Sequence, residues 1–209
     1  MRRYLVPLVV VLLAASRLGA TPTPPSDPIG AAAEKYFAGL FAGLKAVADQ
    51  KPTVDTLRQV MKPLAKNTEG FFGGTLIDTD FVIREVYNKR DFLARGFDLK
   101  KVEQLDYFWD LMRKAPAPQL SEPAHGNIMQ PRLIAMRYPV LTDGRLESVV
   151  SIMVRTEAFL EATGLDRCRG YRIFCRGVLA EEEDGDRKGD WKSVSLALPS
   201  TEWRIEYLP

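Results

Sequence analysis

The sequence predicts an α+β fold, in which N-terminal helices pack on a central antiparallel sheet that carries a helical insertion. Three observations lead to this class. Helical periodicity dominates residues 30–67, runs of β-branched and aromatic residues separated by turn residues fill residues 70–209, and a short helical stretch interrupts these runs. We expect residues 30–209 to form one domain.

The first twenty residues have the parts of a secretory signal. A basic start is followed by an apolar run from Tyr4 to Ala15 and by small residues ending in Ala20. This run is short for a membrane span, which takes about 20 residues. We therefore expect a signal peptide over residues 1–20, a proline-rich linker over 21–29, and a periplasmic or secreted protein that does not span the membrane after cleavage. A buried N-terminal helix is the weaker alternative.

The charge balance argues against a nucleic-acid partner. The net charge is +2, but three of the 29 basic residues lie in the signal, which leaves 26 basic against 27 acidic residues. Nucleic-acid binding normally needs a concentrated basic surface. The hydrophobic fraction of 46% and the charged fraction of 27% are typical of a globular protein.

Two helices are expected before the sheet. The stretch from Gly30 to Asp49 spaces its apolar residues by three and four, as an amphipathic helix does. A second helical stretch opens at Pro52 and is expected to bend or end near Pro63.

The strands follow in order. Phe71 to Tyr87 predicts a strand pair around an acidic turn, and Val102 to Arg113 predicts the short helix of the insertion. Glu157 to Thr163 reads as one or two helical turns. Three further strands are expected over Tyr171–Ala180, Trp191–Leu198 and Thr201–Tyr207, with the charged stretch EEEDGDRKGD as a solvated loop.

The hairpin from Leu133 to Val154 is apolar on both faces. Its Asp143-Gly144 turn pairs Thr142 with Arg145. This register puts Ile134, Met136, Tyr138, Val149, Ser151 and Met153 on one face, and Leu133, Ala135, Arg137, Leu141, Leu146, Val150, Ile152 and Val154 on the other. A solvated face would alternate with polar residues, so both faces must be covered. We expect the N-terminal helices on one side and the insertion on the other.

A ligand cavity is expected between this sheet and the insertion. Its candidate residues are Tyr107, Trp109, Arg113, Arg132, Met136, Tyr138, Ser151, Met153 and Arg155. Arg132 and Arg155 are expected opposite each other, where a bound anion would offset their repulsion. The alternatives are that the apolar candidates are ordinary core and that the arginines extend into water.

The order and spacing of several segments resemble those of the Cache domains, the PAS-like extracytoplasmic sensor modules of bacteria. The segments are FFGGTLIDTDFVIREVYNKRDFLARGFDL, DYFWDLMRKAPAPQLSEPAHG and RLIAMRYPVLTDGRLESVVSIMVRTEAFLE, and the match covers about residues 70–165. The resemblance implies a PAS-like sheet, a long N-terminal helix and binding of a small-molecule ligand for signal transduction.

The resemblance also implies how the ligand would be held, and here the sequence departs from the family. In the amino-acid-sensing branch an arginine and aromatic residues on the insertion helix bind the ligand carboxylate, and acids bind the ammonium. The arginine position corresponds to Leu105, the aromatic positions to Tyr107 and Phe108, and the strand acid to Met153. We therefore expect a small organic acid rather than an amino acid. Because the chain reaches Pro209 without a transmembrane helix, signalling is expected to need a membrane-protein partner.

No enzyme or cofactor is indicated. His125 is the only histidine, and no nucleophile, base or metal-ligand set accompanies it. Cys168 and Cys175 form a disulfide or remain two free thiols, and their spacing leaves both open. Two functions compete: a small-molecule-binding sensor module, and an interaction or structural module of the same fold whose pocket is filled by Met136, Met153 and Trp109.

Overall fold

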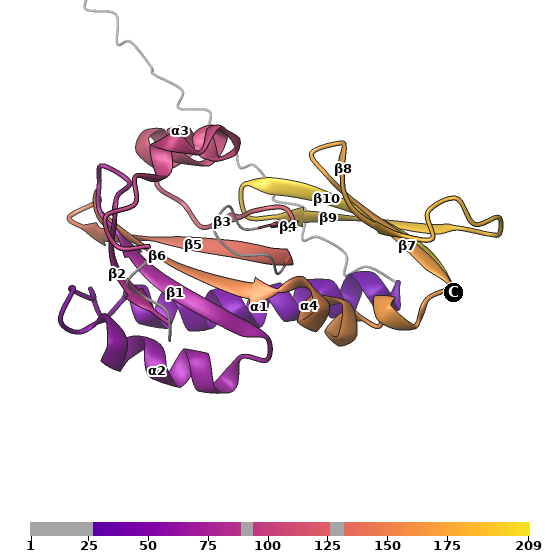
Figure 1. Cartoon of the computed structure of the whole chain (residues 1–209), viewed down its shortest axis with the longest axis horizontal. Coiled ribbons are helices and arrows are strands. Elements are labelled where there is room, and N and C mark those ends of the chain that lie inside the picture. Colours follow the sequence, from indigo (N-terminus) through magenta and orange to yellow (C-terminus); the bar gives the residue numbers. More distant parts are fainter. Residues whose placement is uncertain (1–26, 89–93, 126–131) are drawn as a thin grey trace, which may run out of the picture.

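The computed structural model describes residues 27–88, 94–125 and 132–209, and the predicted signal peptide lies outside these ranges. Helices and two antiparallel sheets make up the described chain, which confirms the α+β class (Figure 1). The first sheet has the order β2-β1-β6-β5-β3, with β4 also pairing with β5. Its strands are β1 (Phe71–Ile77), β2 (Ile83–Tyr87), β3 (Gln119–Leu120), β4 (Ala124–His125), β5 (Arg132–Thr142) and β6 (Arg145–Arg155).

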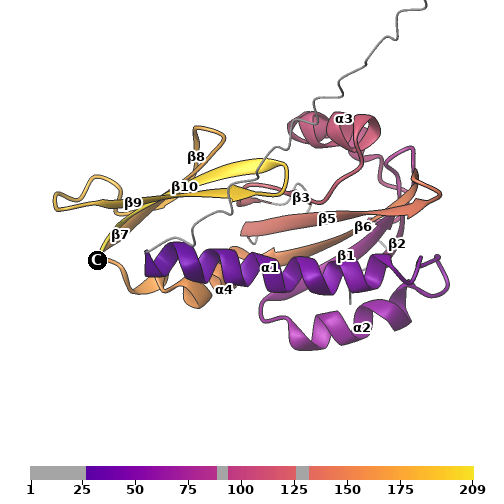
Figure 2. The ribbon, with the colours of Figure 1, turned by 180° about the vertical axis from the view of Figure 1, so that it is seen from behind.

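The long helix α1 (Pro28–Ala48) lies along both sheets (Figure 2). Asp27 caps it, because its carboxylate accepts hydrogen bonds from the amides of Ile29 at 2.9 Å and Gly30 at 3.0 Å. The other carboxylate oxygen of Asp27 accepts from the Tyr207 hydroxyl, so the start of the helix is tied to the last strand. The helix begins two residues earlier than the sequence predicts, inside the expected linker.

Helix α2 (Leu57–Asn67) contacts β1 and β2 and continues through Pro63. Together α1 and α2 cover one face of the first sheet, as predicted (Figure 1). The opposite face is covered by the insertion, which consists of the short 3₁₀ turns η2 (Leu99–Lys101) and η3 (Glu103–Leu105) and helix α3 (Asp106–Lys114). The sequence-based prediction that the β5–β6 hairpin is covered on both faces is confirmed.

The strands after α4 (Thr156–Thr163) and the 3₁₀ turn η4 (Leu165–Arg167) do not extend the central sheet. They form a second sheet of order β8-β7-β10-β9. Its strands are β7 (Gly170–Cys175), β8 (Val178–Glu183), β9 (Lys192–Leu198) and β10 (Thr201–Leu208). The prediction of one strand over Tyr171–Ala180 is therefore wrong, because Arg176 and Gly177, with φ of 51° and 79°, turn the chain into a hairpin.

Aromatic packing joins α1 to the second sheet. The ring of Phe37 stacks on Phe159 of α4 with 5.1 Å between ring centroids and meets Trp203 of β10 edge-on at 5.2 Å. All three rings are buried. Aromatic pairs of this geometry stabilise beyond the burial of their rings, so this cluster helps to hold α1, α4 and the second sheet together.

Candidate ligand site

The faces of the β5–β6 hairpin differ from the predicted ones because β6 contains a bulge. Leu141 pairs with Leu146, but Val140 pairs with Ser148, so Glu147 is an extra residue in β6. A one-residue shift moves every later side chain to the other face. Beyond the bulge, Met136 therefore pairs with Ile152, and Arg137 pairs with Ser151.

The predicted grouping of Met136, Tyr138, Ser151 and Met153 on one face is therefore wrong. Met136 and Tyr138 belong to the core under α1. Ser151 and Met153 lie on the opposite face, under the insertion, and Arg137 joins them there. Of the four, Ser151 remains a candidate for the site, and Met153 is half-buried beside it.

The corrected register produces a row of buried polar residues under the insertion. Thr75 of β1 pairs with Ser151 of β6, Ser151 pairs with Arg137 of β5, and Arg137 pairs with Gln119 of β3. Each of the four is at most 5% exposed. A row of polar side chains across four adjacent strands is unusual inside an otherwise apolar core, because burying such groups is unfavourable unless they find hydrogen-bond partners.

Arg137 is the most unusual member of the row. Its guanidinium carbon lies 4.9 Å from the ring centroid of Trp109 and 5.1 Å from that of Phe108. Among the described residues no hydrogen-bond acceptor reaches its buried Nη1 atom. Burial lowers the pKa of Arg137 to about 10, well below the usual value of an arginine, while the charge of Glu122 acts in the opposite direction. The protein therefore holds a buried cation that a bound anion would stabilise.

The roof of the site is aromatic. Trp109 of α3 stacks on Phe81 with ring centroids 4.6 Å apart, and both side chains are buried. Gln119 donates to the carbonyl of Phe108 at 2.7 Å, which fastens α3 to the sheet edge. Its own Oε1 and the indole Nε1 of Trp109 are buried without a hydrogen-bond partner in the described chain. Together with Arg137, the site offers two unused donors and one unused acceptor.

The other predicted arginines lie elsewhere. Arg132 does not face Arg155: it forms an ion pair with Glu181 of β8 and donates to the carbonyl of Ala180 at 3.2 Å. Arg155 is exposed, pairs with Leu133, and lies over the ring of Phe72. The prediction that Arg132 and Arg155 oppose each other is therefore wrong, again because of the bulge.

The remaining candidates on α3 are at its exposed edge. Arg113 lies over the ring of Phe81 at 4.6 Å and pairs with Asp110 at 3.3 Å. Tyr107 is 45% exposed and carries Arg176 over its ring. Of the aromatic residues predicted on α3, Trp109 and Phe108 contact Arg137 of the buried row, whereas Tyr107 does not lie over it.

The two cysteines are free thiols in this structure. Cys175 is buried in β7, and Cys168 is half-buried, with its thiol directed at the carbonyl of Gly164 at 3.6 Å. Burial raises the pKa of both thiols, which makes them poor nucleophiles.

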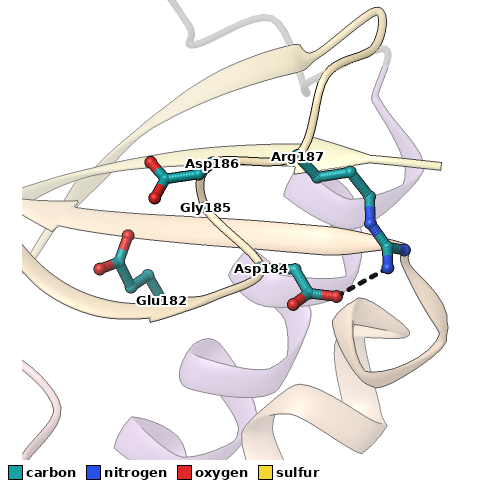
Figure 3. Close-up of a pocket in the computed structure, with 5 residues that line it drawn as sticks. All are labelled: Glu182, Asp184, Gly185, Asp186 and Arg187. Carbon is teal, nitrogen blue, oxygen red and sulfur yellow. Dashed lines mark ion pairs between the residues drawn. The ribbon is translucent and has the colours of Figure 1, made fainter.

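A hollow of about 460 Å³ lies on the outer surface at the β8–β9 loop, away from the buried polar row (Figure 3). Its lining residues are Glu182, Asp184, Gly185, Asp186 and Arg187, and Asp184 pairs with Arg187 at 3.0 Å. None of these residues is buried. The predicted solvated loop over 181–190 is confirmed only from Asp184 onward, because its first three glutamates belong to β8 and Glu181 is buried. Within the described ranges no group of three or more His, Cys, Asp or Glu residues is placed to hold a metal ion.

Sequence reasoning missed Arg137, Thr75 and Gln119 as members of the site. Arg137 gave a signal, because a charged residue in the middle of an apolar strand needs a special environment. Thr75 and Gln119 gave none, since their positions depend on the pairing of β1 and β3 with the hairpin.

Comparisons with solved structures identify similar folds. An extracellular ligand-binding receptor from Desulfohalobium retbaense matches with a TM-score of 0.67 and 16% identity. The match covers 86% of this chain but only 39% of that receptor. The ligand-binding domain of the Pseudomonas aeruginosa amino-acid chemoreceptor PctC, in complex with GABA, matches with a TM-score of 0.62 and 14% identity over 85% of this chain and 94% of that domain. The periplasmic sensory domain of the Campylobacter jejuni chemoreceptor Tlp1 matches with a TM-score of 0.59 and 8% identity over 86% of this chain and 90% of that domain.

No protein-family model matches the chain. No curated protein matches it either. At these identities the structural matches establish the fold alone. The chain has the fold of the Cache-type sensor domains, and the resemblance inferred from the sequence is confirmed at that level. In the described part of the chain, every helix is too short or too polar to cross a membrane.

Proposed function

We propose that the protein is an exported sensor module that binds a small organic acid under the insertion, with Arg137 as the residue that binds the carboxylate. The observation that carries this proposal is the buried guanidinium of Arg137, which lies in the polar row under the aromatic roof and whose Nη1 atom has no hydrogen-bond partner among the described residues. A carboxylate is the natural partner of a guanidinium, because its two oxygens match the fork of N–H donors.

The rest of the row supports the same ligand class. Ser151 offers a hydroxyl beside Arg137, Thr75 offers one on the next strand beside Ser151, and Phe108 and Trp109 offer apolar ring faces to the body of the ligand. The PctC domain of similar fold was solved with GABA, which also bears a carboxylate. The similar folds are named as extracellular or periplasmic, which supports a periplasmic or secreted location and a membrane-protein partner in signalling.

The binding test is a thermal-shift screen of small mono- and dicarboxylic acids, followed by calorimetry on the hits. We expect at least one acid to raise the melting temperature of the wild-type protein by several degrees. Arg137→Met should weaken its binding at least about tenfold, the loss expected when a charged hydrogen bond worth roughly 1.5–3 kcal/mol is removed. Arg145→Met, at the exposed hairpin turn, is the matched control and should bind as wild type.

A second function is favoured by one observation. Trp109 and Phe81 are both fully buried and stack on each other, so they fill part of the space that a ligand would use. The module would then serve as an interaction or structural domain with a filled pocket. Uniformly flat thermal shifts across a broad library, together with the absence of any co-purified molecule in native mass spectrometry, would favour this function over ligand sensing.

A further inference from the structure

The second sheet touches the insertion and β3 through two of its turns, β9–β10 and β7–β8. At the β9–β10 turn, the Pro199 carbonyl accepts from the amide of Leu120 at 3.0 Å, and the Ser200 hydroxyl donates to the carbonyl of Pro118 at 3.0 Å. The hydroxyl of Tyr107 on α3 donates to the Ser200 carbonyl at 3.4 Å. Figures 1 and 2 show this turn next to β3 and below α3 in both views. The roof of the ligand site is therefore fastened to the second sheet.

The β7–β8 turn contributes a cation to the same contact. The guanidinium carbon of Arg176 lies 4.3 Å from the ring centroid of Tyr107 and 5.1 Å from that of Phe108. Arg137 lies at the same distance of 5.1 Å from the Phe108 centroid. One ring of α3 is thus in contact with two cations, one from the buried row and one from the second sheet.

Glu122 supplies the negative charge near both cations. Its Oε1 accepts from Arg176 at 3.1 Å. Its Oε2 is buried and has no hydrogen-bond partner in the described chain. The charge of Glu122 also favours the protonated form of Arg137, against the effect of burial. No direct ion pair joins Glu122 to Arg137 among the described residues, so the carboxylate acts on Arg137 through space.

We propose that Glu122, held in place by Arg176 of the second sheet, determines the charge of the ligand and selects a monoanion over a dianion at Arg137. The three side chains together carry one net positive charge. A monocarboxylate neutralises this charge. A dicarboxylate places a second negative charge near Glu122 in a site where charges are weakly screened, and this repulsion disfavours it.

This inference rests on the proposed function, and it predicts different effects for two changes that each remove one charge. Glu122→Gln keeps the size of the side chain and leaves two net positive charges, so the site should then favour a dianion. Arg176→Gln leaves no net positive charge, so the affinity for both kinds of acid should fall. Because both Arg176 and Glu122 are partly exposed, we expect changes of about tenfold rather than larger ones.

The experiment uses two matched pairs of acids that differ by one carboxylate: pentanoate with glutarate, and benzoate with terephthalate. Dissociation constants are measured by calorimetry at pH 7.5 and fixed ionic strength for the wild type, Glu122→Gln, Arg176→Gln and Arg137→Met. The control is Glu161→Gln, on the exposed side of α4. It removes one negative charge, as Glu122→Gln does, but away from the site. Melting curves verify that each variant is folded.

We expect wild type to bind the monocarboxylate of a pair more tightly, and Glu122→Gln to shift the ratio toward the dicarboxylate by about tenfold. An unchanged ratio in Glu122→Gln, with binding that still depends on Arg137, would overturn this inference and leave the proposed function standing. Failure of wild type to bind any of the four acids would overturn both. A shift of the ratio in Glu161→Gln equal to that in Glu122→Gln would show a general charge effect and would also overturn the role of Glu122.

Discussion

Replacing Arg137 by methionine should stabilise the ligand-free protein. The charged form of Arg137 is disfavoured in the folded state, since burial lowers its pKa to about 10, well below the usual value of an arginine. This difference corresponds to about 3 kcal/mol of unfavourable free energy. Methionine keeps an unbranched stem of similar length and removes the buried charge. The variant loses the contacts of the guanidinium with Phe108 and Trp109, which offset the gain by about 1–2 kcal/mol.

We therefore expect Arg137→Met to increase the free energy of unfolding by about 1–2 kcal/mol, or the melting temperature by about 3–6 °C. The measurement is urea denaturation and calorimetry at pH 7.5 without ligand. Below pH 10 both the folded and the unfolded protein keep Arg137 protonated, so the full destabilisation is present at pH 7.5. It fades only as the pH rises above about 10 toward the usual pKa of an arginine, where the unfolded state binds the proton and the folded state does not.

The control is Arg145→Met, which should change the stability by less than about 0.5 kcal/mol because its side chain is exposed. A loss of more than 1 kcal/mol in Arg137→Met would refute the reasoning, because it would mean that the protein already satisfies this charge. If Arg137 is kept for ligand binding, Arg137→Met should gain stability and lose affinity for the ligand.

Three further predictions concern the fold. Burial raises the pKa of Tyr171 to about 12, so its contribution to stability is complete well below pH 10 and is lost as the pH rises from 10 to 12. Between pH 9 and 11, Tyr171→Phe should therefore lose about 1 kcal/mol less unfolding free energy than wild type in urea titrations. Gly70 has a φ of +68°, and an added Cβ would lie 2.3 Å from the Cβ of Ala158, whereas Gly96 has a φ of +80° and open space. Gly70→Ala should thus destabilise by at least about 1 kcal/mol more than Gly96→Ala, and equal losses would show that the neighbouring helix moves aside. Phe37→Ala should cost about 3–5 kcal/mol, since it removes the ring that joins two other buried aromatic side chains, and a loss below 1 kcal/mol in denaturant titration would show that this cluster is not central to the core.

Local patterns in the sequence were enough to predict the fold class and the cover of the central sheet. The helix spacing of Phe37 and Leu44 and the Asp143-Gly144 turn are local signals, and the structure confirms the elements that they predict. Both faces of the hairpin are apolar, and this alone indicated that both are covered. These inferences need no knowledge of which residues are paired across strands.

The candidate site could not be predicted in the same way, because it depends on pairing. One bulged residue, Glu147, changes the face of every residue beyond it and brings Arg137 under the insertion. Pro139 in the strand interior is a weak sign of such an irregularity. The hairpin at Arg176-Gly177 was also missed, since both residues take positive φ values and arginine is uncommon in such turns. That turn carries the cation that holds Glu122.

The carboxylate of Asp27 links the first helix to the last strand of the described chain. It caps the first turn of α1 with one oxygen and accepts from Tyr207 of β10 with the other. Burial and this hydrogen bond raise the pKa of Tyr207, so the hydroxyl keeps its proton, and the tie persists, at neutral and mildly alkaline pH. A force applied to the segment that precedes α1 would therefore act directly on β10, an inner strand of the second sheet, through the hydrogen bond between Asp27 and Tyr207.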